Sequence, residues 1–327
     1  MEQPEPLTPL TVSVVVCAHT MDRWGDIVDG VAALRSQTSP PVETILVVDG
    51  NSTLERRAAE AFPDVNVIAN RHKSGVSGAR NTGVAHAKGE VIAFLDDDAR
   101  PDVRWIEELL KPYEDPSVVA VGGLALPVWP VDRPSHLVPE LDWLVGCTYQ
   151  GHPTGRSEVR NLFGCNMSVR RDAVELVGGF DENIGRLGHI PLGGDDTEFF
   201  IRLRQYSPGS KVVFEPRAVV HHRVTPERTT WAYLRSRSRA EGMSKAAIAT
   251  MVGAADATSV ESDYVTRVLT AGLRRELGRA LRGNRAGWRG AGGIVACLSL
   301  TGWGYLSGRV RRGIGSVDED ADVRGAG

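Results

Sequence analysis

The sequence predicts an α/β fold in which a mostly parallel sheet carries helices on both faces, followed by a helical extension. Over the first 115 residues, short apolar runs alternate with helix-like patterns, which is typical of βαβ units. Acidic residues stand directly after two of the apolar runs, and an arginine-rich stretch with helical spacing follows residue 226. These three features indicate one α/β domain with an appended helical region.

The first apolar run, TVSVVVCAH, starts at Thr11 and is typical of a buried parallel strand. We expect helical turns through residues 27–34, because apolar residues recur there at helical spacing and two prolines follow at 40–41. Further strands are expected in ETILVV, VNVIAN and EVIAFL, with a helix at 53–61 and a glycine-rich loop that leads into another helix at 75–87.

The alternation weakens after residue 116, and 127–160 is expected to be an irregular connection. A strand, a helix and a glycine stop are expected in NLFGCNMSVRRDAVELVGGF, then a helix in GGDDTEFFIRLRQ. KVVFEPRAVVHH predicts two short strands separated by Glu215 and Pro216.

The overall charge and the cysteines exclude several classes of protein. The chain of 327 residues has a formal net charge of −3, which argues against a globally basic nucleic-acid binder. Its four cysteines are far apart, which disfavours a zinc site or a disulfide scaffold and suits a reducing compartment. The N-terminal residues lack the features of a signal peptide, so we expect a cytoplasmic protein.

Three adjacent aspartates, Asp96 to Asp98, follow the apolar run VIAFL. Side chains at i and i+2 of an extended segment point the same way, so Asp96 and Asp98 can share one target. A hard divalent cation that also binds diphosphate oxygens suits such a pair. The alternative is a solvated acidic turn, but the glycine-rich loop just before the strand favours the metal.

A series of motifs resembles the inverting glycosyltransferases of family 2, which have the Rossmann-like GT-A fold. The series is SVVVCAH, VVDGNS, GVSGARNTGVAHAKGEVIAFLDDDARP, GCNMSVRRDAVELVGGFDE, GGDDTEFFIRLR and AVVHHRV, and it covers roughly residues 11–245. The resemblance implies transfer of a sugar, with inversion, from a nucleotide-diphosphate donor to an acceptor hydroxyl. It also implies Mn²⁺ or Mg²⁺ as the cofactor.

The resemblance assigns the donor and metal residues by position. Asp96, Asp98 and His222 match metal ligands, whereas Val48 stands where the family has the first of two aspartates, so base recognition stays open. The positions that match donor contacts are Ala18, His19, Asp49, Asn51, Gly75, Gly78, Arg80, Asn81, Asp96 and Asp97.

On the acceptor side, Asp196 matches the family's catalytic base, and Asp195 stands where relatives have glutamate. The alternative is that both aspartates only cap a helix. Trp105 and Trp143 are candidates for stacking on an acceptor sugar, although packing in the core explains them equally well.

The resemblance also suggests how the chain is divided. We expect a disordered tail at 1–10, a GT-A catalytic domain at 11–225, a helical extension at 226–312 and an acidic disordered tail at 313–327. Within the catalytic domain, 11–115 is the expected nucleotide-binding half and 116–225 the acceptor half. Two other functions remain open: a nucleotide-sugar-binding module without transfer activity, and a sugar nucleotidyltransferase, which the segment CAHTMDRW disfavours.

The helical extension suggests contact with a membrane. Leu269, Leu273, Leu277 and Leu281 form one helical stripe beside several arginines, and the stretch 290–308 carries no charge. These features fit a peripheral anchor formed by 267–312 at the inner face of the cell membrane, or a helical subdomain that packs on the protein. Arginines at 228, 235, 237 and 239 suit acceptor phosphate, anionic lipid or a solvated helix face. The acceptor is therefore a glycan, a lipid-linked sugar or a small molecule.

Overall fold

The computed structural model describes residues 10–184, 193–253 and 261–324. Within these ranges, nine strands form one sheet with the order β3-β2-β1-β4-β8-β6-β9-β5, and β7 pairs with β9. The strands are β1 (Val12–Ala18), β2 (Glu43–Val48), β3 (Asn66–Ala69), β4 (Val91–Asp96), β5 (Ala99–Pro101), β6 (Val118–Val128), β7 (Ser157–Glu158), β8 (Asn166–Arg170) and β9 (Lys211–Arg223). The expected tail at 1–10 lies almost wholly outside the described residues.

Helices cover both faces of the sheet, as predicted. Strand β1 shows why, because Val14 and Val16 enter one core and Val15 enters the other. The first core lies under α1 (Trp24–Arg35), α2 (Ser52–Ala61) and α4 (Trp105–Leu110), and the second lies under α3 (Val76–His86), α5 (Arg171–Val177) and α6 (Asp195–Tyr206).

The two halves of the sheet differ in strand direction. Strands β3, β2, β1 and β4 are parallel, whereas β8 runs antiparallel to both β4 and β6. The expectation of two strands in 211–222 is wrong, because β9 is continuous and carries an irregularity where its pairing with β6 jumps from Glu215 to Val219. Pro216 lies within that jump and has no N–H to donate to a neighbouring strand.

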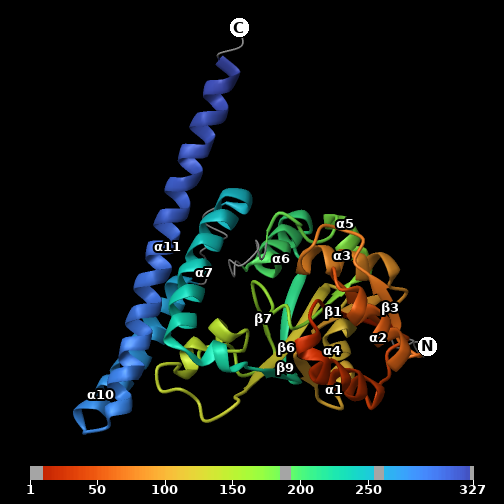
Figure 1. Cartoon of the computed structure of the whole chain (residues 1–327), viewed down its shortest axis with the longest axis horizontal. Helices are drawn as coiled ribbons and strands as arrows, with labels where there is room; N and C mark the ends of the chain where they lie inside the picture. The colour runs from red at the N-terminus through yellow and green to blue at the C-terminus, as the bar shows by residue number, and fades with distance from the viewer. Residues whose placement is uncertain (1–9, 185–192, 254–260, 325–327) are drawn as a thin grey trace, which may run out of the picture.

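The helical extension packs beside the α/β domain (Figure 1). It comprises α7 (Trp231–Val252), α9 (Glu261–Asp263), a π-helical turn η5 (Tyr264–Leu269), α10 (Thr270–Leu281) and α11 (Arg285–Arg324). Glycines allow α7 and α11 to touch, because a Cβ atom at Gly242 would clash with the Thr301 carbonyl and one at Gly304 with the Arg239 carbonyl. One face of the uncharged stretch 290–308 is therefore a helix-packing seam.

The extension buries part of α10 and ends in a long helix. Gly272, Glu276 and Ala280 of α10 are buried, and a Cβ atom at Gly287 of α11 would clash with the Glu276 carbonyl, whereas Leu281 is exposed. Helix α11 is described to Arg324 and so includes most of the segment 313–327. No helix in the described part of the chain is both long and apolar enough to span a bilayer.

Candidate active site

A cavity of about 1570 Å³ lies between the α/β domain and the helical extension. Its floor includes the ends of β1, β2 and β4, where Ala18, Asp49 and Asp96 lie. Its other wall includes Arg237 on α7 and Leu298 on α11. The cavity thus lies where ligands bind in α/β sheets, and residues far apart in the sequence enclose it.

The three expected metal ligands lie together in this cavity. Strand β5 pairs antiparallel with β9, so that Ala99 lies opposite His222 and brings Asp98 next to the imidazole. The Nε2 atom of His222 is 3.2 Å from Oδ1 of Asp98 and 4.0 Å from Oδ2 of Asp96. One ligand atom from each residue lies within 4.8 Å of the others, which is a separation that one cation can bridge.

The charge around Asp98 also suits a cation. Among the described residues, neither oxygen of this buried carboxylate has a well-formed hydrogen bond, although Arg23 lies 3.1 Å away. Burial raises the pKa of Asp98, but His222 and Arg23 outweigh that effect and hold the pKa well below its usual range. Burial lowers the pKa of His222, but Asp98 more than offsets this and raises it to about 10. A divalent cation would take the place of that proton, so the residues fit a metal site.

Asp49 organises the donor side of the cavity. Its carboxylate accepts hydrogen bonds from the Ser74 hydroxyl at 2.9 Å, the Gly75 backbone N–H at 2.8 Å and the Asn70 amide at 2.8 Å. These bonds fix the glycine loop at the start of α3, where Gly75 has a φ of 131°. The N-terminus of a helix attracts phosphate, so this loop is well placed for a diphosphate. Ala18, His19, Gly75 and Arg80 also line the cavity.

Three of the expected donor contacts have other roles in the structure and do not line the large cavity. Asn51 caps α2 by accepting the Leu54 N–H at 3.0 Å. Gly78 is buried against the Lys73 carbonyl, with no room for a side chain. Asn81 accepts the Phe180 N–H at 2.8 Å and donates to the Phe180 carbonyl at 2.9 Å. These residues hold the backbone around the glycine loop and do not face the cavity.

Asp97 lies between the donor and metal groups, and Arg23 binds its carboxylate. It is buried and lines the cavity. Burial raises the pKa of Asp97 to about 7, even though Arg23 opposes that effect. No motif in the sequence marks Arg23, whose guanidinium forms ion pairs with both Asp97 and Asp98.

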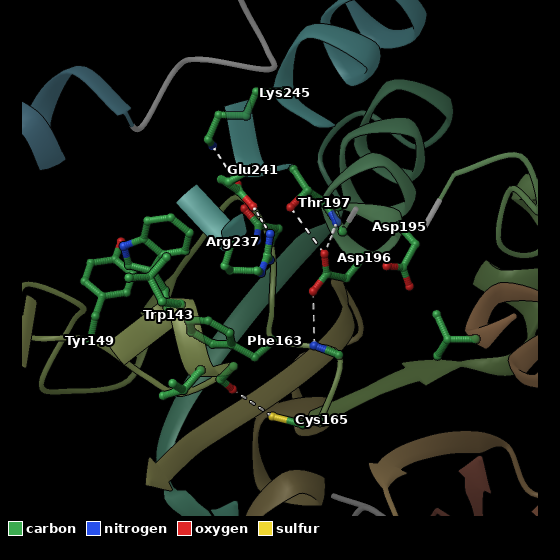
Figure 2. A pocket seen from close by; sticks show the side chains of 18 of the residues that line it. Trp143, Tyr149, Phe163, Cys165, Asp195, Asp196, Thr197, Arg237, Glu241 and Lys245 are labelled. Atoms are coloured by element: carbon green, nitrogen blue, oxygen red, sulfur yellow. Dashed lines mark hydrogen bonds and ion pairs between the residues drawn. The ribbon is translucent and has the colours of Figure 1, made fainter. Parts of the chain in front are cut away.

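Asp196 lies at the start of α6 on the acceptor side (Figure 2). One carboxylate oxygen accepts the Gly164 N–H at 3.1 Å and the other accepts the Thr197 N–H at 2.7 Å. Burial, followed by the neighbouring charge of Asp195, raises the pKa of Asp196 to about 6. A general base works best with a pKa near the working pH, and Asp196 meets that condition.

Asp195 points to another partner and does not cap the helix. Its carboxylate binds the Arg80 guanidinium, which also lies 3.8 Å from Asp96. The N-cap position of α6 is Gly194, with no side-chain cap, and both aspartates lie in the first turn of the helix. Arg80 thereby connects the metal group to the segment that carries Asp196.

The two candidate tryptophans lie in different environments. Trp105 is 0% exposed and donates its indole N–H to Asn166 at 2.8 Å. The expected acceptor role of Trp105 therefore needs correction, because the core leaves none of its surface free for a sugar. Trp143 lines the cavity, and its indole N–H donates to the Tyr264 hydroxyl at 2.7 Å.

Helix α7 adds cavity residues that the sequence analysis did not distinguish from their neighbours. Arg237, Glu241 and Lys245 all line the cavity, whereas Arg235 and Arg239 are exposed. The spacing i, i+4, i+8 places the first three on one helix face. The sequence shows this spacing, but it does not show that this face of α7 lines the cavity.

Comparisons with known proteins agree with this arrangement. The profile of Glycosyl transferase family 2 matches residues 13–178. A glucosyl-dolichyl phosphate glucuronosyltransferase of Haloferax volcanii is 36% identical over 240 residues, covering 72% of this chain and 76% of that protein. A succinoglycan biosynthesis protein of Rhizobium meliloti is 28% identical over 244 residues, covering 71% of this chain and 73% of the other.

Two solved structures share the fold. A mannosyltransferase from Pyrobaculum calidifontis, in complex with GDP-Man and Mn²⁺, has a TM-score of 0.57 at 19% identity and covers 93% of this chain and 89% of its own. GalNAc-T7 with UDP, GalNAc and Mn²⁺ has a TM-score of 0.52 at 19% identity, covering 72% of this chain and 48% of its own. With the family profile and the Haloferax relative, these findings show that the chain belongs to glycosyl transferase family 2 and is a glycosyltransferase that uses a nucleotide-sugar donor.

Proposed function

We propose that the chain is an inverting, metal-dependent glycosyltransferase in which Asp196 is the catalytic base and the acceptor is a lipid-linked sugar phosphate. One observation carries this proposal: a single cavity holds the metal group Asp96, Asp98 and His222, the glycine loop and Asp196. An enzyme that transfers a sugar in one displacement needs these elements on two sides of one anomeric carbon.

In this mechanism the donor lies over the ends of β1 and β2, with its diphosphate beside the N-terminus of α3. A bound Mn²⁺ or Mg²⁺ supplies positive charge for the leaving diphosphate. Asp196 takes the proton from the acceptor hydroxyl as the new bond forms on the opposite face of the sugar. Arg80 keeps the two subsites in register, because it contacts Asp195 and lies near Asp96.

We favour Mn²⁺ as the cofactor. An imidazole among the ligands suits a transition metal better than Mg²⁺, which prefers oxygen ligands. The two solved structures with this fold were both determined with Mn²⁺ and a nucleotide or nucleotide sugar. The nucleotides in these two structures carry different bases, uracil in UDP and guanine in GDP-Man. This chain has Val48 where the family has an aspartate, and the donor screen described below distinguishes the bases.

The acceptor class is suggested by the Haloferax relative, whose name gives glucosyl-dolichyl phosphate as the molecule it glycosylates. In this chain the cavity extends from Asp196 to α11, where Leu298 and Tyr305 line it. A lipid-linked acceptor needs such an outlet, since its chain must leave the active site toward an apolar phase.

We further propose that α11 rests on a membrane surface. Its outer side carries large apolar side chains, between 51% and 63% exposed, that fall within an arc of roughly 80° on the helix. Tryptophan favours the boundary between lipid and water, and the exposed Arg289 and Arg309 suit anionic lipid. Arg275, by contrast, binds Glu140 and Glu276 and contributes less. The outer face comprises Trp288, Val295, Trp303, Leu306 and Val310.

A donor screen tests the enzyme proposal. The full chain is mixed with UDP-, GDP- or dTDP-sugars, with Mn²⁺, Mg²⁺ or EDTA, and its thermal unfolding is followed. We expect one nucleotide class to stabilise the protein with Mn²⁺, by about 2.7 kcal/mol at a ligand concentration of 100 Kd. The product formed with the stabilising donor then shows whether the anomeric configuration is inverted. Retention of configuration would overturn the role of Asp196 as the base in a single displacement.

A further inference from the structure

The cavity wall formed by α7 carries an ordered row of charges. The guanidinium of Arg237 donates to Glu241 at 3.0 Å, and Lys245 lies 3.4 Å from the same carboxylate. Lys245 also donates to Glu261 at 2.5 Å, and Arg160 binds Glu261 at 3.0 Å. Arg237, Lys245 and Arg160 thus alternate with Glu241 and Glu261 along this wall of the cavity.

Arg237 is the member of this row next to the catalytic segment. Its Nη2 atom would lie 3.0 Å from a Cβ atom placed on Gly193, three residues before Asp196. Gly193 is fixed to α7 as well, because its N–H donates to the Ser244 hydroxyl at 3.1 Å. Figure 2 shows the Arg237 side chain reaching from α7 toward the part of the cavity that holds Trp143 and Asp196.

Arg237 is preorganised to bind an anion. Its side chain is 18% exposed, and the centre of its guanidinium is 6.0 Å from the Trp143 ring. Glu241 accepts a hydrogen bond from Nη1 of Arg237. A guanidinium has five N–H donors in one plane, and their spacing matches the oxygens of a phosphate. Partial burial strengthens such a bond relative to one in water.

We infer that Arg237 binds the phosphate of the acceptor, with Glu241 holding the guanidinium in position. This inference rests on the proposed function and deepens it, because it locates the charged group of the acceptor. The sugar that Asp196 deprotonates lies on the catalytic side of Arg237, and the lipid chain beyond the phosphate leaves past α11.

The test compares two acceptors that differ in the phosphate. One is a sugar joined to a short alkyl chain through a phosphodiester, and the other is the matching neutral alkyl glycoside, which lacks the phosphate. We expect Arg237→Gln to lower the ratio of their kcat/KM values roughly 10- to 100-fold, as for loss of a hydrogen bond to a charged group. Arg235→Gln removes the same charge from the exposed side of α7 and is expected to keep the wild-type ratio. Arg237→Lys keeps the positive charge but lacks the planar set of N–H donors. We expect its ratio of kcat/KM values to lie between those of Arg237→Gln and the wild type.

The outcomes separate this inference from the proposed function. An unchanged ratio in Arg237→Gln, with normal wild-type transfer to the sugar phosphate, would overturn the inference alone. An equal loss with both acceptors would make Arg237 a structural residue. Wild-type protein that transfers to neither acceptor would overturn the lipid-linked acceptor, and the inference with it. Thermal unfolding of each variant shows whether the fold is retained, and Arg237→Lys provides the ratio if Arg237→Gln does not fold.

Discussion

The donor half and the helical extension build their parts of the cavity in different ways. In the donor half, Asp49 and Asp96 lie at the ends of two parallel strands that flank β1, so the pairing of both strands with β1 places the two aspartates at one edge of the sheet. In the extension, Arg237 lines the cavity from α7, and glycines let α7 pack closely on α11. The contrast indicates that the donor half depends on strand pairing, whereas the proposed acceptor site depends on how helices pack.

The largest expected effect is in the donor half. Asp98 is buried among charged partners, so its removal would disturb folding as well as metal binding. Asp96→Asn is the cleaner change, because this side chain is 36% exposed. We expect loss of several kcal/mol of transition-state stabilisation, on the order of a 10³-fold fall in kcat/KM. Transfer assays with and without EDTA measure it, and wild-type turnover that ignores EDTA would contradict the metal role.

The second effect concerns Asp196, the proposed base, which lies in the α/β domain and lines the cavity. Asp196→Asn keeps the shape of the side chain and cannot accept a proton, so kcat should fall roughly 10²- to 10⁴-fold with little change in donor affinity. A wild-type pH profile sharpens the test. Because burial raises the pKa of Asp196 to about 6 and the base acts as carboxylate, kcat/KM should fall about tenfold per pH unit below 6. A variant with wild-type turnover would leave Asp196 without a catalytic role.

The third prediction concerns the outer side of the extension. Trp303→Glu combined with Leu306→Glu places two charges on the exposed apolar face of α11. We expect co-sedimentation with vesicles rich in anionic lipid to fall at least tenfold, since each large apolar side chain contributes roughly 1.5–3 kcal/mol when buried. Leu176→Glu, on the exposed surface of α5, is the matched control and should bind like wild type. Wild-type protein that stays in the supernatant at low salt would contradict the membrane proposal.

The smallest effect separates two glycines on one helix. Gly304→Ala adds a methyl group that would clash with the Arg239 carbonyl, whereas nothing lies within 4 Å of the same atom at Gly302. We expect Gly304→Ala to lower the free energy of unfolding by about 1–3 kcal/mol and Gly302→Ala to raise it by up to about 1 kcal/mol through helix propensity. Thermal unfolding measures both changes. Shifts of the same sign would show that the seam is not tightly packed.

The residue patterns predicted the alternation of strands and helices and marked Asp96 to Asp98 as a candidate metal site. These features follow from local patterns: the run before Asp96 is apolar because β4 is buried on both faces, and parallel strands place their ends at one edge of the sheet. The family resemblance then identified the chemistry, since it depends on the order of such motifs.

Which of two residues close together in the sequence faces the cavity could be read only from the folded chain. Arg80 and Asn81 are adjacent, yet one lines the cavity and the other holds the Phe180 backbone. Trp105 lies in the core and Trp143 lines the cavity, although the sequence treats both alike. The physical reason is that a helix or turn fixes the directions of its side chains relative to one another, while elements distant in the sequence determine which direction is buried. For the same reason the uncharged stretch of α11 has one glycine-lined face against α7 and one apolar face left exposed.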